Sequence, residues 1–461
     1  MSVEMDSSLR PIRKLVIANR GEIAVRVQRA CRELGIETVQ VYSEADRDSL
    51  AVQLADQAVC IGPAASSKSY LRPELMVHVA QSLQADAIHP GYGFLSENAA
   101  FADLCEQHGI GFVGPPGRVI ALMGDKASAR AMAVEAGVQV TPGSSGTVPT
   151  AGAATQVAAT LGYPVILKAV AGGGGRGMRV VEREADLAAH FESATREAQS
   201  AFGDGSMYVE KYLTNIRHVE IQILADAHEV LHLGERDCSS QRRNQKLVEE
   251  SPSPGLSESL RSRMGEAAVR LCRHVGYRNA GTIECIVDPA AGEFYFMEMN
   301  TRVQVEHPVT ECVTGVDIVK EQIRIAEGHR LSIRQEDVRL SGHSIECRIN
   351  AEDPARNFMP HPGVLGRVVF PGGPGIRVDS HVYSGYRVPP NYDSLIAKII
   401  AWGRDRGEAI ARMHRALGEL RIEGVPTTAA FLSRLLASNA FASGAMHTRY
   451  VEQFIVEEQR A

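Results

Sequence analysis

The sequence predicts an α/β and α+β protein whose N-terminal part is a doubly wound parallel sheet. Over roughly residues 12–120, short apolar runs typical of strands alternate with segments whose apolar residues recur at helical spacing. A stretch rich in Thr, Pro, Gly, Ser and Ala at Thr141–Gly152 indicates a connection into a different unit. Further along, alternating runs on both sides of Asp288–Gly292 predict an antiparallel hairpin over Thr282–Asn300.

The N-terminal region opens with a strand–turn–helix unit. Lys14–Ala18 is a short apolar run, Asn19–Gly21 follows it, and apolar residues at helical spacing continue until Gly35. The same pattern recurs, which is why we expect a parallel sheet with helices on both faces. It predicts further strands at 38–42, 58–61, 87–89 and 111–114, and helices at 75–83 and 99–108.

From residue 164 onward the pattern is mixed. It predicts strands at 164–170, 178–181, 208–213, 218–224, 229–233, 344–349, 366–370 and 395–402, besides the hairpin. Helices are expected at 184–200, 407–420, 428–436 and 449–458. With 461 residues, the chain exceeds the size of one hydrophobic core, so about three domains are expected.

Composition excludes several classes of protein. The chain has 49 basic and 55 acidic residues and a formal charge of −6, so no overall positive field favours nucleic acid or an anionic membrane. Its 8 cysteines form no Cys-x-x-Cys pair, which argues against a zinc ribbon or a disulfide framework. No run approaches the roughly 18 apolar residues of a membrane span, and the N-terminus lacks the apolar core of a signal peptide. We therefore expect a cytoplasmic protein.

A glycine run, Gly172–Gly177, lies between two predicted strands. It matches G-x-G-x-x-G only formally, because it does not open a helix. Glycines let backbone N–H groups approach phosphate oxygens closely, and Lys168 adds a positive charge just before the run. The segment indicates a phosphate-binding flap; a mobile surface hairpin is the alternative.

The predicted hairpin places two carboxylates face to face. If its register centres on Ala291, Glu284 stands opposite Glu298, and Asn300 shares the face of Glu298. Facing carboxylates repel unless a cation lies between them, and Mg²⁺ prefers such oxygens in nucleotide sites. Two exposed acids on a solvated face are the alternative. Phe294 and Phe296, in phase with Glu298, argue against that alternative.

Directly after the hairpin, Arg302, Gln304 and Glu306 alternate along an extended segment and are expected on one side of it. An arginine fork and an amide can hold a planar oxyanion, and the carboxylate can take a proton. This pattern indicates a small-anion site with its own base. A structural salt bridge between Arg302 and Glu306 is the alternative.

Two further segments carry polar or aromatic groups. Arg236–Lys246 is a dense basic cluster without interleaved aromatic residues, so a small-molecule phosphate fits it better than nucleic acid. A solvated charge run is the alternative. His89–Phe94 is a glycine-punctuated loop at the end of a predicted parallel strand, where α/β sheets place ligands. Tyr92 and Phe94 offer flat surfaces for a ring, or they pack in the core.

Together these segments resemble biotin carboxylase, the ATP-grasp component of biotin-dependent carboxylases. The matching segments are Ile17–Ala24, His89–Asn98, Met123–Lys126, Gly172–Arg179, Glu210–Leu213, Glu298–His307 and Glu346–Asp353. The resemblance implies an N-terminal α/β domain over 12–125 and an ATP-grasp domain over 126–330, whose mobile glycine-loop lid covers about 141–213. A C-terminal domain of mixed β-sheet and helices would follow over 331–461.

The resemblance also implies roles for individual residues. ATP would be bound by Lys126, Lys168, Gly173, Gly174, Gly175, Glu210, Lys211, Leu213, His218 and Gln241. Mg²⁺ or Mn²⁺ would be held by Glu284, Glu298 and Asn300. Bicarbonate would bind to Arg302, Gln304 and Val305, with Glu306 as the base and Lys246 steadying the phosphorylated intermediate. Arg348 would stabilise the biotin enolate, and Tyr92 with Gly93 would border the biotin ring.

The implied reaction is ATP-dependent carboxylation of biotin, with bicarbonate, through carboxyphosphate. Biotin would be carried by a separate biotin carboxyl carrier protein and passed to carboxyltransferase subunits, as in acetyl-CoA carboxylase and fatty acid synthesis; a homodimer is usual in the family. Alternatives are the same subunit of another acyl-CoA, pyruvate or urea carboxylase, a different ATP-grasp ligase, or a non-catalytic nucleotide-binding subunit. Two positions depart from the family pattern: Ala171 stands where a glycine is frequent, and Asn244 where a histidine is usual.

Overall fold

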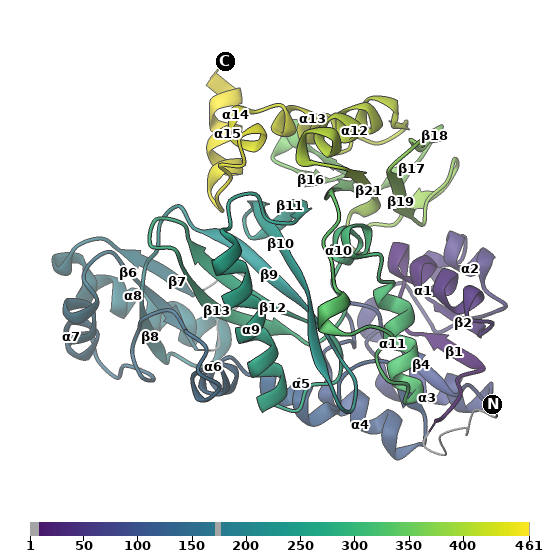
Figure 1. Cartoon of the computed structure of the whole chain (residues 1–461), viewed down its shortest axis with the longest axis horizontal. Helices are drawn as coiled ribbons and strands as arrows, with labels where there is room; N and C mark the ends of the chain where they lie inside the picture. The colour runs from purple at the N-terminus through teal and green to yellow at the C-terminus, as the bar shows by residue number, and fades with distance from the viewer. Residues whose placement is uncertain (1–8, 171–176, 461) are drawn as a thin grey trace.

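The computed structural model describes residues 9–170 and 177–460. Its N-terminal part is a five-stranded parallel sheet in the order β3-β2-β1-β4-β5 (Figure 1). The strands are β1 (Lys14–Ile17), β2 (Glu37–Tyr42), β3 (Gln57–Cys60), β4 (Ala87–His89) and β5 (Gly111–Phe112). The helices of this part are α1 (Gly21–Glu33), α2 (Leu50–Leu54), α3 (Pro73–Ser82) and α4 (Ala99–Gln107).

Strand β1 shows why this sheet is doubly wound. Leu15 and Ile17 point into one hydrophobic core with α1, while Val16 points into a second core with α3 and α4. Successive side chains of a strand face opposite ways, so an uninterrupted apolar run needs helices on both faces. The predicted parallel α/β sheet is therefore confirmed.

A small antiparallel sheet in the order β7-β6-β8 projects from the body of the protein, at the left of Figure 1. Its strands are β6 (Val165–Ala169), β7 (Met178–Val181) and β8 (Met207–Lys211). Helices α7 (Ala151–Leu161) and α8 (Glu184–Phe202) cover it and share one hydrophobic core with it. Helix α7 lies partly within the segment that the sequence indicated as a connection.

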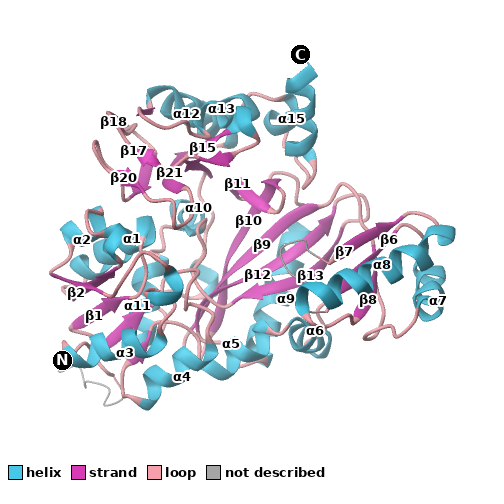
Figure 2. Ribbon diagram, turned by 180° about the vertical axis from the view of Figure 1, so that it is seen from behind, coloured by secondary structure: helices cyan, strands magenta, loops and turns pink. Residues whose placement is uncertain are grey.

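The largest element is an eight-stranded antiparallel sheet in the order β13-β12-β9-β10-β11-β14-β21-β19. Its strands are β9 (Arg217–Ala225), β10 (Val230–Arg242), β11 (Gln245–Ser251), β12 (Asn279–Asp288), β13 (Glu293–Asn300), β14 (His343–Asn350), β19 (Ile376–Ser380) and β21 (Leu395–Gly403). Figure 2 shows its long central strands from behind. Strands on both sides of residue 330 belong to this one sheet, and the domain limits at 125 and 330 stay predictions.

Helices pack against the large sheet at both of its ends. The first half is covered by α5 (Gly117–Gly124), α6 (Lys126–Glu135) and α9 (Glu258–His274), and the second half by α12 (Arg406–Glu419) and α13 (Ala429–Leu436). The remaining helices are α10 (His307–Thr314), α11 (Ile318–Glu327), α14 (Asn439–Ala442) and α15 (Tyr450–Arg460). Short pairs complete the fold: β15 (Glu352–Asp353) with β16 (Met359–Pro360), β17 (Gly363–Val364) with β20 (Arg387–Val388), and β18 (Val368–Val369) with β22 (Arg421–Ile422).

The sequence predicted most of these elements, with two kinds of error. Strand β18 has only two residues where a strand over 366–370 was expected. Several elements were not predicted at all: helices α2, α5, α6, α7, α9, α10, α11 and α14, and the longer strands β11 and β19. Among the described residues, no helix combines the length and apolarity needed to cross a membrane.

Candidate active site

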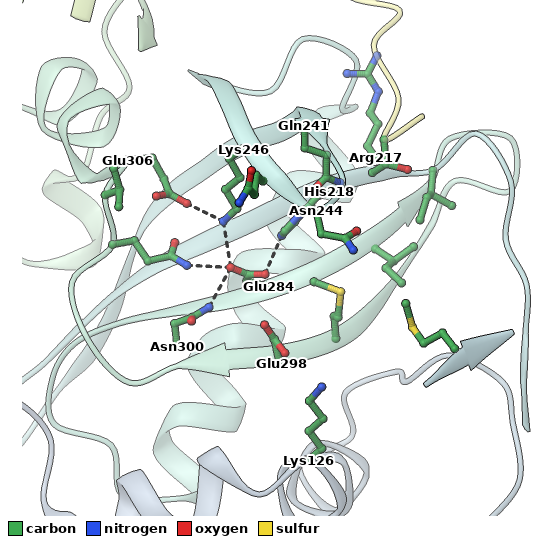
Figure 3. Close-up of a pocket in the computed structure, with 18 of the residues that line it drawn as sticks. Lys126, Arg217, His218, Gln241, Asn244, Lys246, Glu284, Glu298, Asn300 and Glu306 are labelled. Atoms are coloured by element: carbon green, nitrogen blue, oxygen red, sulfur yellow. Dashed lines mark hydrogen bonds and ion pairs between the residues drawn. The ribbon is translucent and has the colours of Figure 1, made fainter. Parts of the chain in front are cut away.

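A cavity of about 830 Å³ lies over the first strands of the large sheet, facing the small sheet. Figure 3 shows its charged floor. Most of the residues that the sequence singled out line it: Lys126, Lys168, Glu210, His218, Gln241, Lys246, Glu284, Glu298, Asn300, Arg302, Gln304, Val305, Glu306 and Arg348. These residues come from α6, β6, β8 to β14 and the segment after β13, so the fold gathers into one cavity groups that are far apart in the sequence.

The hairpin of β12 and β13 brings Glu284 opposite Glu298, as predicted. The predicted geometry was nevertheless incomplete. Near the turn Asp288 pairs with Glu293, so the register there differs by one residue from the expected one. A bulge at Met297 then compensates this shift, and Glu284 and Glu298 face each other. A bulge shifts the phase of a strand by one residue. Phe294 and Phe296 therefore pack in the core with Met299 and do not share the face of Glu298, which corrects that part of the prediction.

Glu284 is the most heavily bonded carboxylate of the floor and is only 5% exposed, so the alternative of a solvated acid is wrong. One oxygen accepts hydrogen bonds from Lys246 (3.0 Å), Asn300 (2.8 Å) and Gln304 (2.8 Å), and the other lies 2.8 Å from His218 Nε2. Burial opposes its charge, but Lys246 and His218 hold its pKa well below the usual range. Glu284 is thus an anion surrounded by donors.

Lys246 joins three carboxylates. Its ammonium lies 2.6 Å from Glu220, 3.0 Å from Glu284 and 2.6 Å from Glu306. Lys246 belongs to the basic cluster noted in the sequence, which the structure places on β10, β11 and the turn between them. Arg236 of the same cluster is 0% exposed and Arg242 is buried, so the part of the cluster on β10 is not a solvated charge run, whereas Arg243 to Gln245 at the turn are exposed.

Glu306 lies between two cations. Its carboxylate accepts from Lys246 (2.6 Å) and from Arg348 (3.0 Å), and Arg348 also donates to the buried Glu249 (2.6 Å). Burial favours the neutral acid, yet Lys246 and Arg348 keep the pKa of Glu306 well below its ordinary value. Glu306 is consequently ionised and able to accept a proton.

Arg302 and Gln304 are held at the edge of this group. Arg302 donates to Glu97 (2.8 Å) and to the side chain of Asn300 (2.7 Å). The alternative of an Arg302–Glu306 salt bridge is therefore not formed. The Gln304 amide oxygen accepts from Arg236 (3.1 Å), so its NH₂ group points to Glu284 and the cavity. Both side chains line the cavity beside Glu306, and their role in binding an anion stays a prediction.

The other end of the cavity is formed by the small sheet. Lys168 on β6 forms an ion pair with Glu210 on β8, and Arg130 lies 3.1 Å from the second oxygen of Glu210. Lys126 is exposed at the start of α6. Among the described ion pairs, those at this end join Lys168 and Arg130 to one carboxylate, whereas Lys246 joins three.

Some predicted residues do not line the cavity. The Lys211 ammonium caps α7 by donating to the carbonyl of Gly162 (2.9 Å), and Leu213 follows the end of β8. The Tyr92 hydroxyl donates to Glu22, and the neighbouring Gly93 has a φ of 68°. Their predicted roles stay predictions. Gly173, Gly174, Gly175 and Ala171 lie outside the described residues.

Three partners of the site residues were not predicted from the sequence: the buried Glu220 and Glu249 and the exposed Glu97. Glu220 bonds both Arg236 and Lys246, Glu249 bonds Arg348, and Glu97 bonds Arg302. A signal for Glu220 was available, because polar His218, Glu220 and Gln222 alternate with Val219, Ile221 and Ile223 along β9. That pattern marks a strand with one polar face.

The floor fits a divalent cation. Burial and the facing Glu284 carboxylate raise the pKa of Glu298, which is the effect expected for two acids brought together without a cation between them. Asn300 lies on the same side; an amide oxygen is a further hard ligand, although in this arrangement it accepts from Arg302 while the NH₂ group donates to Glu284. His218, Glu220 and Glu284 also offer ligand atoms within 4.8 Å of one another. Glu284, Glu298 and Asn300 together thus have the chemistry of a Mg²⁺ site.

Comparison with known proteins identifies the class. Residues 125–334 match the family model described as carbamoyl-phosphate synthase L chain, ATP binding domain. The fold and the charged cavity therefore define an ATP-dependent ligase of the ATP-grasp type.

The flanking parts give the family. Residues 11–120 match the model of the biotin carboxylase N-terminal domain, and residues 346–453 match the biotin carboxylase C-terminal domain. Biotin carboxylase 1 of Bacillus subtilis is 56% identical over 446 residues, covering 96% of this chain and 99% of the relative. The chain belongs to the biotin carboxylase family.

Related proteins have several partners and ligands. A pyruvate carboxylase subunit of Methanothermobacter thermautotrophicus is 52% identical, covering 96% of this chain and 90% of that protein. A Campylobacter jejuni biotin carboxylase solved as a beta-gamma-ATP complex superimposes with a TM-score of 0.91 at 49% identity, covering 96% and 99% of the two chains. The biotin carboxylase domain dimer of Hydrogenobacter thermophilus 2-oxoglutarate carboxylase, solved with MgADP and bicarbonate, gives 0.90 at 50% identity, covering 96% and 98%.

Proposed function

We propose that this protein carboxylates biotin on a separate carrier protein, using bicarbonate and ATP. The observation that carries the proposal is the position of Glu306: an ionised carboxylate between Lys246 and Arg348, beside the N–H donors of Arg302 and Gln304. Bicarbonate is a planar anion that must lose a proton when it attacks phosphorus. This corner offers both donors for the anion and a base for the proton.

The first step is attack of a bicarbonate oxygen on the γ-phosphorus of ATP. A carbon-bound oxygen forms a bond to phosphorus, the bond from phosphorus to the ADP oxygen breaks, and Glu306 takes the bicarbonate proton. Carboxyphosphate and ADP result. Glu284, Glu298 and Asn300 would hold the Mg²⁺ or Mn²⁺ that neutralises charge on the transferring group. Lys168, Lys126 and His218 would contact the phosphates, and Glu210, Lys211 and Leu213 the adenine and ribose.

The strength of Glu306 as a base depends on Lys246. In the described arrangement Lys246 keeps the pKa of Glu306 low, and so makes it a weak base. A phosphoryl group in the cavity competes with the three carboxylates for the Lys246 ammonium. Moving that charge away from Glu306 raises the basicity of Glu306 when the nucleotide is in place. The same ammonium then steadies the phosphorylated intermediate.

The second step transfers the carboxyl group. Carboxyphosphate splits into CO₂ and phosphate, the phosphate takes the ureido proton of biotin, and the biotin nitrogen attacks CO₂. Arg348, held by Glu249 and Glu306, would stabilise the negative charge on the ureido oxygen. Tyr92 and Gly93 would border the biotin ring. Exclusion of water is required, because carboxyphosphate hydrolyses, and we assign that role to the lid at about 141–213.

The carboxylated carrier needs a carboxyltransferase. We propose acetyl-CoA carboxylase, and hence fatty acid synthesis, as the setting, with a biotin carboxyl carrier protein and carboxyltransferase subunits as partners, a homodimer as the assembly and the cytoplasm as the compartment. Pyruvate carboxylase is the second candidate, since a relative at 52% identity has that name. Another acyl-CoA or urea carboxylase would use the same site.

The direct test uses the purified chain with MgATP, bicarbonate and free biotin. We expect ADP formation that requires bicarbonate and increases with biotin, together with ¹⁴C-labelled carboxybiotin. ATP cleavage that ignores biotin and responds instead to ammonia or an amino acid would favour a different ATP-grasp ligase. Absence of nucleotide turnover with intact MgATP binding would favour a non-catalytic subunit. Offering acetyl-CoA and pyruvate carboxyltransferases in turn identifies the acceptor.

A further inference from the structure

Lys398 is a buried cation outside the cavity. It lies in the middle of β21 and is 0% exposed. Its ammonium donates to the backbone carbonyl of Val305 (2.7 Å) and pairs with Glu22 on α1 (3.0 Å). A buried ammonium is costly unless it is paired and hydrogen-bonded, so these two contacts must hold it firmly.

Glu22 extends this contact to the N-terminal part of the chain. The oxygen that pairs with Lys398 also accepts the Tyr92 hydroxyl bond. The second oxygen of Glu22 is buried and has no hydrogen-bond partner among the described residues. Glu22 of α1 thus connects Tyr92, in the loop after β4, to Lys398 of β21. The Lys398 ammonium in turn holds the Val305 carbonyl.

The segment held in this way contains the anion corner. Val305 lies between Gln304 and Glu306, whose side chains both line the cavity. The carbonyl of Gln304 is fixed separately, by His307 Nδ1 at 2.7 Å. A carbonyl only accepts, so His307 carries its proton on Nδ1, and burial lowers its pKa to about 3, which keeps the ring neutral. The two consecutive carbonyls are therefore each capped by a buried side chain.

We infer that Lys398, anchored by Glu22, is a positioning residue for bicarbonate use: by capping the Val305 carbonyl it fixes the directions of Gln304 and Glu306. The inference rests on the proposed function. Asp379 (4.0 Å) and Glu346 also face Lys398, and Asp379 is in addition paired with Arg377 (2.7 Å). The competing interpretation is that Lys398 only joins three parts of the fold.

The test removes the donor without leaving Glu22 as an unpaired buried charge, and Asp379 keeps its partner Arg377. In the double variant K398M/E22Q both members of the pair are neutral and close to isosteric, a replacement that proteins tolerate better than loss of one partner. We expect the KM for bicarbonate to rise at least tenfold, while the Kd for MgATP, measured by calorimetry, changes less than threefold. K398R keeps the charge opposite Glu22 but moves the donor, and we expect its KM for bicarbonate to rise at least threefold.

A matched control exists in the same molecule. Arg406 pairs with Glu250 (2.7 Å) and donates to the backbone carbonyl of Phe441 (2.7 Å), and neither side chain lines the cavity. R406M/E250Q removes a pair with a similar pattern of contacts, although Arg406 is 17% exposed and Glu250 also lies 2.8 Å from His343. It should lower the unfolding temperature and leave the KM for bicarbonate within twofold of wild type.

Three outcomes overturn the inference. One is a KM for bicarbonate within twofold of wild type in folded K398M/E22Q or, if that variant does not fold, in K398R. Another is an equal loss of bicarbonate and MgATP affinity, and the third is an equal kinetic effect in R406M/E250Q. A wild-type protein without bicarbonate-dependent ATP cleavage refutes the proposed function first, and the inference with it. An active wild type with unaffected Lys398 variants refutes the inference alone.

Discussion

The two ends of the cavity are built differently. At the anion end, Glu284 accepts from three side chains and pairs with a fourth, and Lys246 contacts three carboxylates. At the nucleotide end, Lys168 and Arg130 share Glu210 on a separate three-stranded sheet, and Lys126 is exposed. One end is interlocked on the large sheet, and the other is carried by a projecting unit.

This difference matches the demands of the proposed reaction. Electrostatic stabilisation is effective when the charges are already oriented before reaction, and the interlocked floor provides that. A nucleotide must enter and leave at every turnover, so a small sheet that can close over it suits the other end. We therefore expect substitutions at the anion end to affect turnover, and substitutions at the nucleotide end to affect ATP affinity.

Glu306→Gln should give the largest effect. The amide retains the shape of the side chain but cannot take a proton, so turnover should fall by about 10²-fold or more, the usual scale for a general base. The Kd for MgATP should stay within threefold of wild type. Steady-state ADP release and calorimetry measure the two quantities, with the exposed Glu336→Gln as the control. Near-normal bicarbonate-dependent ATP cleavage would remove Glu306 from the mechanism.

Arg348→Ser should come next. Removing the guanidinium leaves Glu249 and Glu306 without their shared partner, and loss of a group that stabilises an oxyanion costs about 10²-fold in turnover. Carboxybiotin formation should fall by that factor while MgATP binding persists. The free energy of unfolding should also drop by about 3 kcal/mol, as for a broken buried pair. Unaffected biotin carboxylation would refute the role of Arg348.

The sequence could predict those features that are encoded by residues close together in the chain. The parallel sheet was predictable because each strand–turn–helix unit is encoded locally, as at Lys14–Glu33. The facing pair Glu284 and Glu298 was predictable because a short hairpin brings residues of similar distance from its turn together. Helix α9 was missed although Leu260, Met264 and Leu271 follow helical spacing. The helical spacing of these apolar residues is a local pattern, so this helix could have been predicted from the sequence.

Other features depended on contacts distant in sequence. The bulge at Met297 inverts the facing of Phe294 and Phe296, and nothing in the local alternation shows it. Glu249 reaches the site because β11 pairs with β14 and thereby places Glu249 beside Arg348. Strand order is fixed by packing of the whole sheet, so it lay outside what residue spacing can predict.

Lys168→Gln probes the nucleotide end. A hydrogen bond from a charged donor contributes about 1.5–3 kcal/mol, and partial exposure of Lys168 lowers that value. We expect the KM for ATP to rise about tenfold. The KM for bicarbonate should stay within twofold, because the side-chain partner of Lys168 among the described residues is Glu210, at the nucleotide end. Arg179→Gln on the adjacent strand β7, which pairs with Glu197 and does not line the cavity, is the control. Equal changes in the KM for ATP and the KM for bicarbonate would show that the two ends of the cavity do not act separately.

The acidic side of the pH profile should depend on Glu249. Burial raises the pKa of Glu249 to about 6, although Arg348 opposes this. As the pH falls through that value Glu249 gains a proton and Arg348 loses one of its two counter-charges. Biotin carboxylation should then fall about fourfold at pH 5.5, the loss expected from simple titration at this pKa.

The loss of biotin carboxylation at low pH does not arise from unfolding caused by protonation of Glu249. Because the folded pKa of Glu249 lies above its ordinary value, the folded state takes up the proton first, and its contribution to stability increases as the pH falls from about 6 towards 4.5. Carboxylation rates and thermal unfolding followed over the same pH range separate the two. Glu249→Gln should remove the inflection, and an unchanged profile in that variant would assign it elsewhere.

Asn244→His should have the smallest effect. Asn244 lies on the turn between β10 and β11 with a φ of 63°, beside Arg243 at 48°. Asparagine adopts this left-handed conformation readily and histidine somewhat less so, so the free energy of unfolding should fall by no more than about 1 kcal/mol. The side chain is exposed at the edge of the cavity, and the KM for ATP should change less than threefold.

Asn244→Gly, which keeps the turn and removes the side chain, is the control. A KM for ATP at least tenfold lower in Asn244→His alone would show that histidine makes a nucleotide contact which asparagine lacks, and that the turn belongs with the nucleotide end of the cavity.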